Sequence, residues 1–201
     1  LDGYEEHMSI WEKSYQMFAE VLPSDCQKIL DLGCGTGLEL DQIWQRKSDM
    51  DVTGVDLCQS MLDQLLKKHS DKRLTTVCQD YFRYNLGNEK WDAVISFESL
   101  HHFLPERKKE LYQRVCQGLK RGGVFLLADY IACCDEEDEL LRSTYLKRRK
   151  QFAIPDDRFV HFDIPLTLAH ECELLQNAGF VLGEVLDNPD GATIIAAEKR
   201  G

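Results

Sequence analysis

The sequence predicts an α/β fold with a doubly wound, seven-stranded sheet. We expect the sheet to be mostly parallel, with an antiparallel C-terminal strand and helices on both faces. Three observations predict this fold. From residue 28 onward, short apolar segments alternate with amphipathic helical segments, as in a parallel sheet. The first strand runs directly into a glycine-rich turn that opens a helix. The last two strand segments are joined by the short turn 188–191, so they must be antiparallel.

Composition restricts the kind of partner. At 201 residues we expect a single domain, 1–201, with a substantial core. The formal net charge of −11 repels a phosphate backbone, which favours a small-molecule partner and disfavours nucleic acid. No segment approaches the ~20 apolar residues of a membrane span, and no signal peptide is recognisable. The eight cysteines lack C-x-x-C spacing, so we interpret them as reduced thiols of a cytoplasmic protein.

The first element is an amphipathic helix within residues 1–23. Its apolar residues recur at steps of three and four and Pro23 ends it; the face consists of Tyr4, Met8, Trp11, Tyr15, Phe18 and Leu22. We expect this face to pack on the sheet. The alternative, compatible with packing, is that Tyr4, Trp11 or Tyr15 covers a ligand, since aromatic rings attract cations.

The glycine-rich turn is the strongest functional signal. A buried strand, 28–32, contains Asp31 and is followed by Gly33, Gly35 and Gly37 at alternate positions. A helix to about residue 47 and a strand, 51–56, come next, and Asp56 closes that strand. This layout predicts a nucleotide-type cofactor site at the carboxyl end of a parallel sheet. A dinucleotide fingerprint requires glycine at position 38, where this chain has leucine, so a nicotinamide dehydrogenase is disfavoured.

The remaining elements follow from the same periodicities. A helix ends near His69, and Pro105 begins another whose apolar face is Leu111, Val115 and Leu119; Gly122 and Gly123 end it. Thr167 is the expected N-cap of the last helix. The expected strands are 74–78, 93–97, 124–129, 180–186 and 192–197, and a further helix spans 135–151.

The motif Asp31-x-Gly33-x-Gly35-x-Gly37 resembles motif I of the class I S-adenosylmethionine-dependent methyltransferases. The segment 90–103 resembles their motif IV, and 119–127 resembles their L-K-P-G-G motif, with Arg121 in place of proline. The resemblance implies a Rossmann-like fold and S-adenosyl-L-methionine as cofactor. It also implies that the glycine loop holds the methionine part, Asp56 the ribose and Asp80 the adenine. The implied cofactor-binding residues are Asp31, Gly33, Cys34, Gly35, Gly37, Asp56, Leu57, Met61, Asp80, Tyr81, Phe97 and Glu98.

Methyl transfer requires positioning more than acid–base chemistry, because the sulfonium methyl is already activated. No single catalytic residue is therefore expected. The candidates for a base or an acceptor-orienting group are Glu98, His101, His102, Asp129 and His161. No cluster with metal-ligand spacing is visible in the sequence, so we expect no metal.

The segment 131–165 is implied to be an inserted cap that selects the substrate. Acids at 135–139 and bases at 147–150 complement a helix dipole, so a solvated helix explains them; the alternative is that 147–150 binds an anionic acceptor or RNA. The leading hypothesis is a methyltransferase acting on a small molecule. The alternatives are a tRNA-modifying methyltransferase and a non-catalytic regulatory protein that binds the cofactor.

Overall fold

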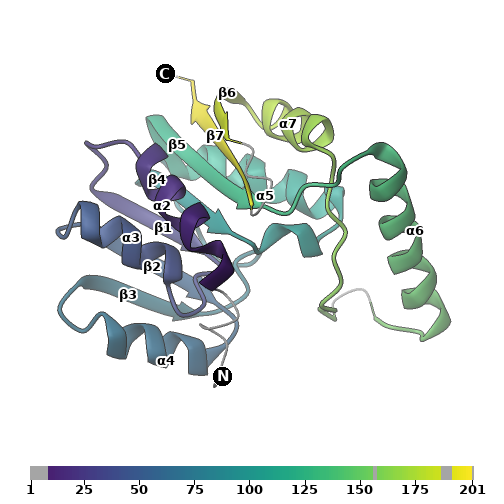
Figure 1. The fold of residues 1–201 in the computed structure, drawn as a ribbon, viewed down its shortest axis with the longest axis horizontal. Helices are drawn as coiled ribbons and strands as arrows, with labels where there is room; N and C mark the ends of the chain where they lie inside the picture. The colour runs from purple at the N-terminus through teal and green to yellow at the C-terminus, as the bar shows by residue number, and fades with distance from the viewer. Residues whose placement is uncertain (1–8, 156–157, 187–191, 201) are drawn as a thin grey trace.

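The structure is a computed structural model that describes residues 9–155, 158–186 and 192–200. Its sheet has seven strands in the order β3-β2-β1-β4-β5-β7-β6 (Figure 1). The strands are β1 (Lys28–Leu32), β2 (Asp51–Asp56), β3 (Arg73–Cys78), β4 (Trp91–Phe97), β5 (Leu119–Asp129), β6 (Phe180–Leu186) and β7 (Thr193–Lys199). Only β7 pairs antiparallel, with β5 and with β6. The predicted fold class is confirmed; the predicted turn 188–191 lies outside the described residues.

Helices cover both faces of this sheet. They are α2 (Glu12–Val21), α3 (Leu38–Arg46), α4 (Gln59–Lys68), α5 (Pro105–Gly118), α6 (Asp135–Gln151) and α7 (Leu168–Asn177), with short 3-10 turns η1 (Ser9–Trp11) and η2 (Leu100–His102). One apolar cluster joins α2, α3 and α4 to the sheet, and the other joins α5 and α7 to its opposite face. Within the part of the chain that is described, no helix is long and apolar enough to cross a membrane.

Two expected boundaries change. The N-terminal helix was expected from Tyr4, but residues 1–8 lie outside the description, and η1 precedes the helix at Glu12. The helix expected to bury Leu119 ends one residue earlier, and Leu119 pairs with Trp91 as the first residue of β5. Gly122 and Gly123 therefore lie within β5. The start of β5 is irregular: its register with β4 shifts between Trp91 and Ala93, and Gly122 has φ 71°. A bulge of this kind lets the extra residues stay in the sheet.

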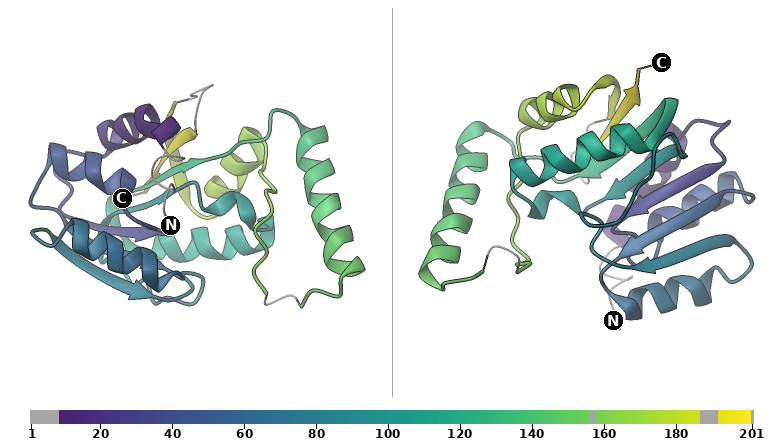
Figure 2. Two further views of the ribbon diagram at one scale, coloured as in Figure 1. Left: turned by 60° about the horizontal axis from the view of Figure 1, so that its bottom comes forward. Right: turned by 180° about the vertical axis from the view of Figure 1, so that it is seen from behind.

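The chain order places a crevice at the carboxyl end of β1. Strand β1 lies between β2 and β4, so the sheet order reverses there, which is where ligands bind in doubly wound folds. Helix α6 stands at one side of the molecule, apart from the sheet (Figures 1 and 2). The segment after α6 returns to the body, where Thr167 bridges Ala132 and the Ile164 N–H donates to the His101 carbonyl at 2.8 Å.

Candidate functional site

The turn after β1 brings bare backbone against the loop that follows β4. Gly33, Gly35 and Gly37 have φ angles of 83°, 48° and 72°, a region that residues with a Cβ rarely adopt. A Cβ at Gly33 would lie 2.4 Å from the Ser99 Oγ. Glycine is therefore required at this position by its conformation and by the space available.

Asp56, at the end of β2, holds the glycine turn in place. Its Oδ2 accepts a hydrogen bond from the Gly35 N–H at 3.0 Å, and its Oδ1 accepts one from the Cys58 N–H at 2.7 Å. A carboxylate has further acceptor capacity. The side chain therefore fixes the loop while keeping the ability to accept from a ligand hydroxyl.

A cavity of about 460 Å³ opens between the glycine turn, the end of β2 and the loop after β4. Ten of the twelve predicted cofactor residues line it: Gly33, Cys34, Gly35, Gly37, Asp56, Leu57, Met61, Tyr81, Phe97 and Glu98. Tyr15 of α2 lines it too, in agreement with a covering role for the N-terminal helix. Trp11 instead packs against the core on that face, and Tyr4 lies outside the described residues.

Asp31 and Asp80 are placed differently from the other ten. Asp31 is fully buried beside Glu39, and of these two acids only Glu39 lines the cavity. Burial raises the pKa of both carboxyls. The Asp80 Oδ1 accepts from the Phe82 N–H at 2.9 Å, and its Oδ2 lies 3.8 Å from an Arg107 nitrogen, so Asp80 caps its own turn.

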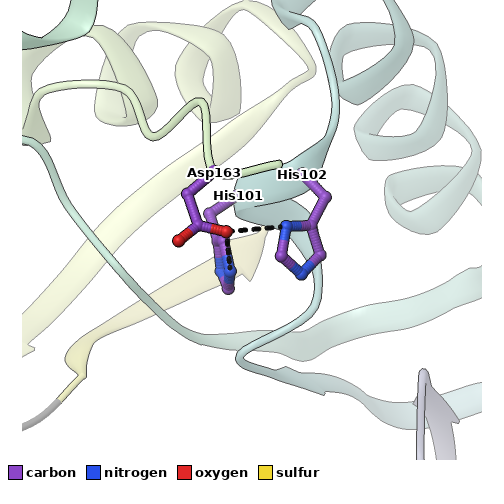
Figure 3. A group of neighbouring side chains, drawn as sticks. All are labelled: His101, His102 and Asp163. Atoms are coloured by element: carbon purple, nitrogen blue, oxygen red, sulfur yellow. Dashed lines mark ion pairs between the residues drawn. The ribbon is translucent and has the colours of Figure 1, made fainter. Parts of the chain in front are cut away.

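The catalytic candidates gather at the carboxyl ends of β4 and β5. The His101 Nδ1 lies 2.5 Å from the Asp129 Oδ1 and 3.7 Å from a Glu98 oxygen. The His102 and His161 rings lie 4.2 Å apart between centroids. Asp163, which the sequence analysis had not selected, lies against both adjacent histidines (Figure 3). His102 and His161 line the cavity, whereas His101 and Asp129 lie behind them.

Comparison with known proteins agrees with this geometry. A family model described as "Methyltransferase domain" matches residues 29–123, which contain the glycine turn, Asp56 and the loop after β4. Carboxy-S-adenosyl-L-methionine synthase of Nautilia profundicola is 26% identical over 173 residues, covering 81% of this chain and 73% of that protein. The family model and this relative support a class I S-adenosylmethionine-dependent methyltransferase.

Solved structures show the same fold. 1,6-Didemethyltoxoflavin-N1-methyltransferase of Burkholderia thailandensis, solved with 1,6-didemethyltoxoflavin and S-adenosylhomocysteine, superposes with a TM-score of 0.71 at 17% identity; the match covers 100% of this chain and 85% of that one. An O-methyltransferase family protein from Burkholderia thailandensis superposes with a TM-score of 0.73 at 16% identity. That match covers 95% of this methyltransferase but only 56% of the longer chain.

The residues present fit S-adenosyl-L-methionine, the cofactor of this family. Among the described residues, the buried Thr36 Oγ1 in the cavity wall has no hydrogen-bond partner, so a polar ligand would satisfy it. The Tyr15 and Phe97 rings lie 4.4 Å apart between centroids, tilted by 39°, and provide aromatic surface of the kind that favours a sulfonium. When bound, the cofactor supplies the activated methyl group.

Two groups in the cavity of the methyltransferase have shifted pKa values. Burial, aided by the charges of His101 and His161, lowers the pKa of His102 to about 4, so it is neutral at pH 7. Burial and the Asp129 charge raise the pKa of Glu98 to about 8. Glu98 also has φ 46°, a strained backbone conformation of the kind that functional sites retain. At neutral pH the methyltransferase thus presents an uncharged imidazole and a largely protonated carboxyl here.

A second cavity, of about 510 Å³, adjoins the first. It lies between α5, α6 and the segment after α6, and it shares His102, Phe103 and Phe159 with the cofactor cavity. Arg107, Arg149, Lys150 and Arg158 also line it. Its described lining contains no carboxylate.

Sequence reasoning missed Thr36, Glu39, Ser99, Phe159 and Asp163. The first two lie inside or next to the glycine motif, so a wider reading of that motif would have found them. Ser99 faces Gly33 across the crevice, and Phe159 and Asp163 come from the segment after α6. Only the folded chain brings these three to the site.

Proposed function

We propose that this methyltransferase transfers the methyl group of S-adenosyl-L-methionine to a small molecule that binds in the second cavity. The observation that supports this most strongly is the wall that the two cavities share. His102, Phe103 and Phe159 border both, so an acceptor in the second cavity would lie next to a cofactor in the first. In-line transfer needs such adjacency.

The acceptor that suits the second cavity has an apolar body and an anionic group. Phe103, Ile154 and Phe159 provide apolar surface. Arg107, Lys150 and Arg158 provide positive charge in a protein whose net charge is −11. An arginine presents a planar set of donors that suits a carboxylate or phosphate.

The segment 131–165 fits the role of a substrate cap in this proposal. Helix α6 and the segment that follows it provide most of the second cavity's lining, including Tyr145, Leu146 and Val160. Four of the five catalytic candidates then fall into two layers. His102 lies in the wall between the two cavities and His161 in the wall of the first, while His101, paired with Asp129, lines neither. The eight free thiols agree with a cytoplasmic location.

A second candidate function comes from the names of the relatives. Several of the relatives found are carboxy-S-adenosyl-L-methionine synthases, whose product carries an added carboxylate. The cationic lining of the second cavity also suits a carboxylate donor. This alternative predicts that mass spectrometry of the reaction finds a cofactor product heavier than S-adenosyl-L-methionine.

The test is a transfer screen with methyl-labelled S-adenosyl-L-methionine. A metabolite extract separated by anion exchange serves as acceptor pool, with a tRNA pool beside it. We expect labelled product from retained, anionic small-molecule fractions. Label in tRNA would support the tRNA-modifying alternative, and tight cofactor binding without transfer to any pool would support the regulatory one.

In the same screen, Lys150→Glu on the cavity side of α6 should reduce transfer at least tenfold. The matched control is Lys147→Glu, one turn earlier on the same helix and outside the cavity lining, which should leave transfer unchanged. Equal activity of both variants would show that positive charge in the second cavity plays no part in acceptor binding.

A further inference from the structure

Three side chains from two distant segments meet at the wall that separates the two cavities. His101 and His102 belong to η2, and Asp163 belongs to the segment after α6 (Figure 3). The Asp163 Oδ1 lies 3.2 Å from the His102 Nδ1 and 3.6 Å from the His101 Nε2. One ligand atom from each residue lies within 4.8 Å of the other two. We propose that these atoms form a binding site for a divalent first-row cation.

The spacing matches what a cation requires. Metal–nitrogen and metal–oxygen distances of about 2.0–2.2 Å place neighbouring ligand atoms roughly 3–3.5 Å apart in tetrahedral or octahedral geometry. The Asp163 Oδ1 lies 3.2 Å from one histidine nitrogen and 3.6 Å from the other. A small adjustment of the half-exposed Asp163 side chain would complete the geometry.

His102 provides an independent observation. Its side chain is about nine-tenths buried, and within the described part of the chain the buried Nδ1 forms no hydrogen bond, although the Asp163 carboxylate lies 3.2 Å away. Leaving a buried polar nitrogen unsatisfied is costly. A cation between this nitrogen and Asp163 would satisfy it.

His101 is oriented as metal-binding histidines are. Its Nδ1 lies 2.5 Å from the buried Asp129 carboxylate, so the N–H is directed there and the Nε2 lone pair faces Asp163. A carboxylate behind a histidine fixes the tautomer and ring orientation in metal sites. Asp129 is therefore a positioning residue for His101.

The backbone holds the third ligand in position. The Ile164 N–H donates to the His101 carbonyl at 2.8 Å, so the residue next to Asp163 is tied to the turn that carries both histidines. The sequence alone predicts no metal, because Asp163 lies about 60 residues after the two adjacent histidines and no metal-ligand spacing is visible. The fold creates the cluster.

Two imidazoles and one carboxylate suit Zn²⁺, Fe²⁺, Co²⁺ or Mn²⁺, and three protein ligands leave positions open. His102 lines both cavities, so an open position would face the acceptor. If the proposed function holds, the cation would lower the pKa of an acceptor hydroxyl. The hydroxyl proton passes to solvent, the oxygen lone pair forms the bond to the methyl carbon, and sulfur keeps the electron pair of the broken C–S bond.

The test is a calorimetric titration of chelator-treated full-length protein with Zn²⁺, with Co²⁺ absorbance reporting the coordination. We expect one site per chain. Asp163→Ala and His102→Ala should each weaken binding about 100-fold, and Asp129→Asn about 10–100-fold. Thermal unfolding of each variant, compared with the wild type, confirms that it is folded.

Two matched controls separate this site from adventitious binding. His170→Ala removes a histidine that is also paired with an aspartate, Asp138, and should bind Zn²⁺ as the wild type does. Replacing Cys133 and Cys134 by serine removes the exposed adjacent thiols and should also have no effect. The proposal would be overturned if the wild type did not bind Zn²⁺, or if the His102 and Asp163 variants bound Zn²⁺ as tightly as the wild type. This readout needs no acceptor, so a failed transfer screen would leave it standing.

Discussion

Gly33 shows how one residue can determine whether the site forms. It combines φ 83° with a position where a Cβ would lie 2.4 Å from the Ser99 Oγ. We predict that Gly33→Ala weakens S-adenosyl-L-methionine binding at least tenfold, because the turn must move away from the loop after β4. Calorimetry measures this directly.

The control for this prediction is Gly87→Ala. Gly87 has a similar φ of 74°, but its nearest side-chain neighbour would be 3.4 Å away, on Lys90, outside the cofactor cavity. It should lose about 1–2 kcal/mol of stability from the left-handed backbone and keep wild-type affinity. Equal loss of affinity in both variants would attribute the effect to backbone strain in general.

Asp56 is the second residue whose removal should affect the cofactor. Asp56→Ala removes the acceptor of the Gly35 and Cys58 N–H groups, together with any bond to the ribose. We expect cofactor binding to weaken by about 1–3 kcal/mol. Asp63→Ala on α4, which removes only a surface bond to Gln59, should change nothing. Unchanged affinity of the Asp56 variant would refute the role assigned to this carboxylate.

Site residues were predictable where a local pattern determines them. The glycine turn and the end of β2 are each specified by a few consecutive residues, and ten of the twelve predicted residues line the cavity. Asp31 and Asp80 do not line it. Asp31 is fully buried, and the Asp80 carboxylate caps its own turn. Asp163 was not predictable, because the returning segment after α6 decides where it lies.

At the scale of elements, α5 and α7 are joined by a buried polar cluster. The Lys108 Nζ lies 2.5 Å from the Glu171 Oε2, and the Tyr112 hydroxyl donates to the other oxygen of the same carboxylate. We predict that Lys108→Ala lowers the free energy of unfolding by about 3–5 kcal/mol, because it leaves the Glu171 charge buried and unpaired. Denaturant unfolding measures this.

The adjacent Lys109→Ala, on the exposed face of α5, should stay within about 0.5 kcal/mol of the wild type. If Lys108→Ala changed the free energy of unfolding as little as Lys109→Ala, the buried Glu171 carboxylate would not depend on this lysine.

Helices α6 and α7 are tied together by a pair that titrates. The His170 Nδ1 lies 2.9 Å from the Asp138 Oδ2, and the Arg142 guanidinium and the Thr167 N–H also face Asp138. The hydrogen bond to Asp138 raises the pKa of His170. The resulting stabilisation is fully present below the unfolded-state pKa of about 6.5, and it is lost as pH rises through the higher folded-state pKa.

His170→Gln should therefore be less stable than the wild type by up to about 1 kcal/mol near pH 5.5, a small value because the His170 side chain is half exposed. The difference should disappear at alkaline pH. Thermal unfolding at both pH values tests this, and a constant difference would mean that the charge on His170 is not involved.

The elements themselves were largely predictable, because each of the seven strands follows from a short apolar run. The boundary between α5 and β5 was not. Leu119 fits the apolar face of the helix, yet pairing with Trp91 extends β5 to include it. Local periodicity cannot anticipate an irregular strand that a neighbouring strand stabilises.

At the scale of the whole molecule, net charge and the position of the two cavities support the proposed small-molecule acceptor. The chain has a formal net charge of −11, while arginine and lysine side chains line the second cavity. The cofactor cavity lies at the sheet, and the second cavity lies under α6 and the segment that follows it. In the proposed function, the two ligands would therefore be held by different parts of the chain.

Hydrogen–deuterium exchange with and without S-adenosylhomocysteine tests this division most directly. The account predicts protection of residues 33–39, 56–61 and 97–99, which line the first cavity, and little change in residues 145–154 of the second. Protection confined to residues 145–154, with none in the glycine turn, would contradict it.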